Sequence, residues 1–168
     1  MQAIELLRAA LAQTDEGLAA IAAPLQSHPL IQPVERGGRG SGNHPTWILG
    51  HLAFVEGAVC QAITGKSNPM AHLEAICGMG SQPKPEAALY PPFQELLSTC
   101  RRLRQETIRL LDEIGDAGLD RVPAHVPPGF EEVMPTIGRA FLLLTLHQMV
   151  HYGQLADARR AAGIAPLI

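Results

Sequence analysis

Cysteine is scarce in this chain, and its spacing argues against both a disulfide framework and a thiolate zinc site. Only Cys60, Cys77 and Cys100 occur among 168 residues, and they form no C-x-x-C pair. An odd number of widely spaced cysteines is typical of neither a secreted disulfide scaffold nor a zinc ribbon. We therefore expect reduced thiols and a soluble, cytoplasmic protein.

Positive charge is sparse as well. The formal net charge is -3, and the largest basic group consists of Arg101, Arg102 and Arg104. These arginines fall outside the apolar positions of their segment, which predicts a solvated outer helix face. No nucleic-acid partner is expected, because such binding needs a basic patch. Residues 36–42 are rich in glycine, but no G-K-[ST] follows them, which argues against a nucleotide-binding loop.

Long hydrophobic runs are also missing. The longest strongly apolar stretch runs from Phe141 to Leu144, which is far too short to cross a bilayer. The N-terminal segment carries Glu5 and the polar triplet Thr14, Asp15 and Glu16, which is not typical of a signal peptide. We expect no membrane partner.

What the chain does contain is helical periodicity. Hydrophobic residues make up 46% of the sequence and recur at three- and four-residue spacing, with no convincing strand pattern. This pattern predicts an all-α four-helix bundle formed by one domain over residues 1–168. The predicted helices span about residues 3–23, 45–64, 92–114 and 136–162.

Prolines and glycines mark the helix ends and two long connections. Pro24 ends the first helix, while Pro45 begins the second behind a cap predicted at Asn43. Long connections follow the second and third helices, and the first of these includes a short helix predicted at 69–76. Residues 140–150 are apolar nearly all round, which predicts that the last helix is the most buried.

Three histidines on two of these helices form a candidate metal site. His147 and His151 are four residues apart and share one helix face, while His51 lies on the predicted inward face of the second helix. Neutral imidazoles bind zinc, nickel, iron or copper, and three of them leave coordination positions open. The pair at 147 and 151 is also compatible with two core histidines that only donate hydrogen bonds.

Two further residues could complete or support this site. Gln154 follows His151 by three residues, so it could orient a ligand or form an inter-helix contact. His44 could supply a fourth ligand, although a helix cap or loop is its commoner role. Gln148 stands where the zinc-protease motif H-E-x-x-H has its catalytic glutamate, which argues against a protease because an amide cannot accept the proton.

The residues Ile48-Leu49-Gly50-His51-Leu52-Ala53, together with His147-x-x-x-His151-x-Gly153-Gln154-Leu155, resemble the DinB-like (DinB/YfiT) superfamily of four-helix bundles. The order and lengths of the helical segments agree with that family over nearly the whole chain. Tyr152 stands where these proteins often carry arginine. The resemblance implies a divalent ion such as zinc, nickel, iron or manganese on His51, His147 and His151, and often a homodimer.

Two functional hypotheses follow from this resemblance and from the incomplete ligand set. The first is a metal-dependent enzyme that transfers a low-molecular-weight thiol, such as bacillithiol, mycothiol or glutathione, to a small electrophilic substrate. The second is a non-catalytic, metal-binding stress-response bundle that acts as a homodimer. A fourth protein ligand would favour the second hypothesis. A third possibility is a structural bundle that binds no metal.

Overall fold

The computed structural model describes residues 2–33 and 42–167, so most of the glycine-rich connection lies outside the described residues. The fold is an all-α bundle, as predicted, and the described residues form no strand. Four long helices make up the bundle, and their bounds are α1 (Ala3–Ala22), α2 (Pro45–Thr64), α4 (Phe93–Ile114) and α5 (Ile137–Ala161).

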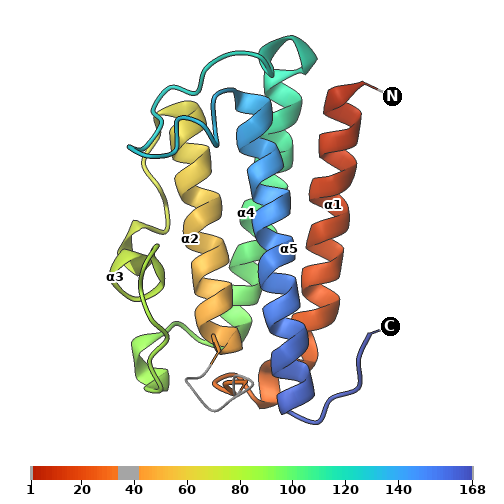
Figure 1. Cartoon of the computed structure of the whole chain (residues 1–168), viewed down its shortest axis with the longest axis vertical. Coiled ribbons are helices and arrows are strands. Elements are labelled where there is room, and N and C mark those ends of the chain that lie inside the picture. The colour runs from red at the N-terminus through yellow and green to blue at the C-terminus, as the bar shows by residue number, and fades with distance from the viewer. Residues whose placement is uncertain (1, 34–41, 168) are drawn as a thin grey trace.

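Each long helix packs against two neighbours and lies diagonal to the third. The neighbouring pairs are α1 with α4 and α5, and α2 with the same two helices. Figure 1 shows that α1 and α5 run downward while α2 and α4 run upward. The connection after α2 must therefore return along the bundle, and it contains two short 3-10 turns, Ala71–Leu73 and Ala87–Leu89, and the short helix α3 (Glu74–Cys77).

The helix ends follow from local chemistry. A 3-10 turn over Ala23–Ser27 follows α1, where Pro24 cannot continue the α-helical ladder. The cap of α2 is His44, not Asn43 as predicted: the Nδ1 of His44 accepts a 3.0 Å hydrogen bond from the Trp47 backbone N–H. Asn43 instead donates its side-chain amide to Gln154 on α5.

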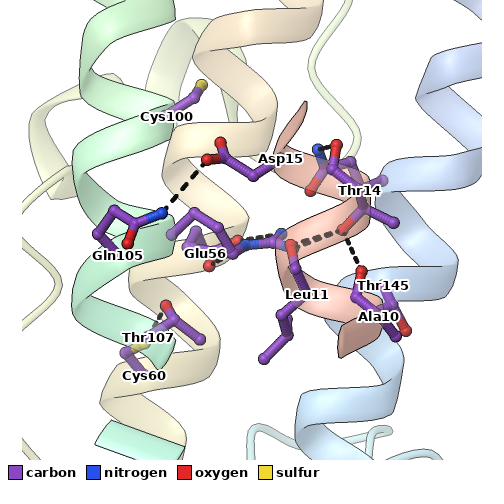
Figure 2. A network of polar contacts seen from close by, with 12 residues as sticks. Ala10, Leu11, Thr14, Asp15, Glu56, Cys60, Cys100, Gln105, Thr107 and Thr145 are labelled. Atoms are coloured by element: carbon purple, nitrogen blue, oxygen red, sulfur yellow. Dashed lines mark hydrogen bonds and ion pairs between the residues drawn. The ribbon is translucent and has the colours of Figure 1, made fainter. Parts of the chain in front are cut away.

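The core consists of two apolar clusters with a polar layer between them. One cluster joins the N-terminal halves of α2 and α4 to the C-terminal halves of α1 and α5, and the other joins the opposite halves. Between them lie the half-buried Thr14 and the buried Asp15, Glu56, Arg104 and Gln148, all from the middle of the long helices. Figure 2 shows Thr14, Asp15 and Glu56 of this layer.

An ion pair dominates the polar layer. Arg104 donates two 2.8 Å hydrogen bonds to the two carboxylate oxygens of Glu56 and one of 2.9 Å to the hydroxyl of Thr14. The prediction of an outer-face Arg104 is wrong, since this side chain is only 3% exposed. Its charge tolerates burial because the carboxylate and the hydroxyl satisfy the guanidinium. Arg101 and Arg102 do lie on the surface.

The prediction that the last helix is the most buried is also wrong. Ten of the 25 residues of α5 are buried, against 16 of the 20 residues of α2. Within the described ranges, α2 is the one helix long and apolar enough to cross a membrane, but 83% of its apolar window is buried, as in the core helix of a bundle. The outward side of α5 remains apolar and exposed.

Candidate metal centre

The three predicted histidines meet at one point between α2 and α5. The Nε2 atom of His147 lies 3.2 Å from the Nε2 atoms of both His51 and His151. His51 and His151 are 6% exposed, whereas His147 is half-buried. The centre is therefore enclosed on two sides and accessible beside His147.

His51 is held in place by one contact at the edge of its ring and one on a face of the ring. Its Nδ1 lies 2.7 Å from the Cys77 carbonyl oxygen at the end of α3. The indole of Trp47 stacks on the imidazole at a centroid distance of 4.7 Å and an interplanar angle of 9°. Trp47 is itself fixed by donating Nε1–H to Ser81 Oγ over 3.1 Å. These contacts restrain the ring before any ligand binds.

His151 is oriented in the same manner by two side-chain amides in series. Its Nδ1 lies 2.8 Å from Gln154 Oε1, and the same oxygen accepts a 3.1 Å hydrogen bond from Asn43 Nδ2. Asn43 precedes α2, so this contact also ties the start of α2 to α5. A ligand histidine commonly donates its outer N–H to an oxygen in this way.

The donor chemistry of the cluster fits a cation. The partners of the His51 and His151 Nδ1 atoms are carbonyl oxygens, which accept hydrogen bonds, so each Nδ1 carries the proton and each Nε2 presents a lone pair. A single proton on His147 Nε2 could satisfy only one of these lone pairs. A divalent ion would satisfy all three nitrogens. Tetrahedral zinc places its nitrogen ligands roughly 3.3 Å apart, close to the separations seen here.

The ligand set is incomplete. Among the residues that the structure describes, no cysteine, aspartate, glutamate or further histidine joins these three nitrogens. His44 is fully buried but is engaged elsewhere, since its Nε2 donates to the Lys84 carbonyl oxygen over 3.0 Å while its Nδ1 caps α2. Open positions on a bound ion would be left for a small molecule or water.

The environment keeps the imidazoles neutral, which is the form that binds metal. Burial lowers the pKa of His147 to about 3, assisted by the nearby His151, His51 and Arg104. Burial likewise lowers the pKa of His151 to about 4, and it lowers the pKa of His51 despite the hydrogen bond to Cys77. At neutral pH the site needs to release no proton from these rings before binding an ion.

These lowered pKa values predict how the metal-free protein responds to acid. An unfolded histidine titrates near pH 6.5, so the unfolded chain binds more protons than the folded chain below that pH. The free energy of unfolding should therefore fall as the pH is lowered from about 7.5 to about 5.5. Urea unfolding of chelator-treated protein measures this, and His147→Gln should reduce the dependence. An equal pH dependence of the free energy of unfolding in His147→Gln would contradict the lowered pKa of His147.

The close approach of α3 to α2 yields a second prediction. A Cβ atom added at Gly50 would overlap the Sγ of Cys77, whose carbonyl holds His51. Gly50→Ala should displace α3, lower the melting temperature and weaken zinc binding about tenfold. Gly153→Ala on α5 is the matched control, because a Cβ there meets nothing within 4 Å. Unchanged zinc affinity in Gly50→Ala would show that the Cys77 contact does not matter.

A comparison with known protein families agrees with this architecture. The DinB superfamily matches residues 2–155 of the chain. No curated protein and no solved structure matches it. The family match covers nearly all of α1 to α5, including all three clustered histidines, and the chain therefore belongs to the DinB superfamily.

Proposed function

We propose that this protein binds a divalent metal ion on His51, His147 and His151 and transfers a low-molecular-weight thiol to a small electrophilic substrate. The observation that carries the proposal is the convergence of three Nε2 lone pairs on one point, with no fourth ligand among the described residues. A closed structural site would need four protein ligands, whereas three leave room for a reactant.

A bound ion would lower the pKa of a thiol or water that enters an open position. The surrounding residues favour a thiol over water as the nucleophile. Hydrolysis by water needs a general base, and the one buried glutamate among the described residues, Glu56 on α2, has both carboxylate oxygens engaged by Arg104. A thiol needs less assistance, because its sulfur is nucleophilic once the proton is lost.

In the proposed reaction the thiol sulfur forms a bond to an electrophilic carbon of the substrate. The leaving group departs with the electron pair of its bond to that carbon, and the thiol proton passes to solvent. Oxidation states do not change, so the reaction needs no external oxidant or reductant. The half-buried His147 marks the side of the cluster from which both reactants would approach.

Consumption of a thiol tests the proposal. The chelator-treated protein is supplied with zinc, nickel, iron(II) or manganese, with glutathione, bacillithiol or mycothiol, and with a chloronitroaromatic electrophile. We expect turnover that requires both metal and protein, that is lost in His51→Ala and that is retained in His72→Ala, whose histidine is exposed and remote in sequence from the cluster. Metal binding without turnover for any of these thiols would contradict the transferase and favour a non-catalytic stress-response role.

We also propose a cytoplasmic location for this activity. The three cysteines are free, and burial raises the pKa of Cys60 to about 11 and that of Cys77 to about 12. Burial also raises the pKa of Cys100, so all three thiols are poor nucleophiles at neutral pH and the chain offers no competing cysteine sulfur of its own. The reactive thiol must then be a separate small molecule, and low-molecular-weight thiols are kept reduced in the cytoplasm.

A further inference from the structure

A cavity of about 270 Å³ opens between the C-terminal halves of α2 and α4, away from the metal centre. Its lining includes Cys60, which follows His51 by nine residues on α2. Nine residues make about two and a half helical turns, so Cys60 and His51 lie on opposite faces of that helix. The cavity is therefore separate from the three histidines, and its volume is slightly below that of pockets for drug-sized ligands.

One wall of the cavity is fixed by the connection after α2. A Cβ atom added at Gly57 would overlap Asn68 Oδ1, so the glycine lets this connection approach the helix closely. Asn68 is buried and donates its side-chain amide to the Phe54 carbonyl oxygen over 3.1 Å, while its Oδ1 accepts a 2.8 Å hydrogen bond from the Met70 backbone N–H. These contacts hold Pro69 at the edge of the cavity before any ligand binds.

The deeper part of the lining is mainly apolar. Leu103 is buried, and Leu110 and Cys60 are half-buried. Glu56 also lines the cavity, but both of its carboxylate oxygens already accept hydrogen bonds from Arg104. A ligand would therefore place an apolar group here, because a charged group would lose its hydration and find no free partner.

Charges of both signs surround the mouth of the cavity. Lys66 follows α2, and Glu106, Arg109 and Glu113 belong to α4; all four are exposed. The three residues of α4 share one helix face, yet Arg109 pairs with neither glutamate. Glu106 pairs with Arg102, whereas Lys66, Arg109 and Glu113 form no ion pair with any described residue. Cationic and anionic groups are thus both available to a ligand at the mouth.

We propose that this cavity binds a zwitterionic α-amino acid with an apolar side chain. The side chain would occupy the apolar part of the cavity. The carboxylate would face Lys66 and Arg109, and the ammonium group would face Glu113. A molecule with only one of these charges would leave the other side of the mouth unpaired. This site goes beyond the proposed function, since it involves neither the metal ion nor the thiol.

A series of ligands of matched size tests the role of the two ligand charges. Phenylalanine should bind saturably when it is titrated into the full chain and followed by NMR. Phenylpropanoate lacks the ammonium group and phenylethylamine lacks the carboxylate, so each should bind about fivefold more weakly than phenylalanine. Glycine, which has no side chain, should show no saturable binding. The absence of saturable binding for phenylalanine at millimolar concentrations would overturn the proposal, as would equal affinities for the three aromatic molecules.

Two variants test which residue pairs with which ligand charge. Arg109→Gln should weaken phenylalanine binding about fivefold and leave phenylethylamine binding unchanged, because phenylethylamine has no carboxylate. Glu113→Gln should weaken phenylalanine and phenylethylamine but not phenylpropanoate. Arg139→Gln on α5 and Glu95→Gln at the other end of α4 are the matched controls, since both remove an exposed charge away from the cavity. Wild-type affinity for phenylalanine in both Arg109→Gln and Glu113→Gln would overturn the proposal.

The metal centre provides the last control. Neither added zinc nor His51→Ala should change the affinity for phenylalanine, because His51 lies on the opposite face of α2 from the cavity. A loss of phenylalanine binding in His51→Ala would place the ligand at the metal centre and overturn the separate site. A failure of thiol transfer leaves these titrations unaffected, so the two proposals are tested independently.

Discussion

Replacing His51 with alanine should weaken zinc binding at neutral pH by on the order of a hundredfold or more. His51 is the only ligand that α2 contributes, so its loss leaves two nitrogens one turn apart on α5. A competition titration against a chromophoric chelator measures the change in affinity. His151→Ala should cause a similar loss, and it also releases Gln154 from its contact with the ring.

Thermal unfolding provides an independent measurement of the same change. An ion that binds only the folded chain raises the melting temperature with concentration, and this increase should disappear in His51→Ala. The control is His72→Ala, which removes an exposed histidine from the connection after α2. Wild-type zinc affinity in His51→Ala would show that the three nitrogens do not bind the ion together.

Breaking the central ion pair should produce the largest loss of stability. Glu56→Gln leaves the Arg104 guanidinium buried with a neutral partner, because Arg104 and Glu56 are only 3% and 5% exposed. The free energy of unfolding should fall by about 3 kcal/mol, the lower end of the range for an unpaired buried charge. Urea denaturation measures this as a lower midpoint with an unchanged slope.

Two controls separate the ion pair from other effects of the substitution. Glu106→Gln removes the exposed partner of Arg102 on the same helix, and it should change the free energy of unfolding by less than about 0.5 kcal/mol. The double variant Glu56→Leu with Arg104→Met removes both charges and should recover most of the lost stability. A double variant as unstable as Glu56→Gln would show that the loss comes from packing and not from the charge.

The long helices and the histidine cluster could be predicted because both depend on local sequence spacing. Proline and glycine mark the ends of α1 and α2, and the four-residue interval fixes His147 and His151 on one helix face. The inward position of His51 followed from apolar residues on both sides of it. In each case the position of a residue in the sequence determines the helix face on which its side chain lies.

The remaining features depend on contacts between distant segments. The Cys77 carbonyl reaches His51 from 26 residues away, and a backbone oxygen has no side-chain pattern that reveals it. Arg104 is predicted to face solvent because it falls outside the apolar positions of its segment, whereas in the structure it pairs with the buried Glu56 on α2. Residues 140–150 of α5 are apolar nearly all round, so the sequence does not indicate which side of this helix the other helices cover. The exposed Leu146 and Val150 are therefore predicted to be buried.

The layer of polar side chains at mid-height has a consequence for how the helices align lengthwise. Two apolar helix faces can shift by one turn along their axes and still bury apolar surface. Hydrophobic packing alone is therefore compatible with several axial registers. A shift of α4 by one turn would separate the Arg104 guanidinium from Glu56 and from Thr14, and it would leave this charge buried and unpaired among apolar side chains. We expect this polar layer to select a single axial register of the helices. That register also fixes the level along α5 at which His51 meets His147 and His151.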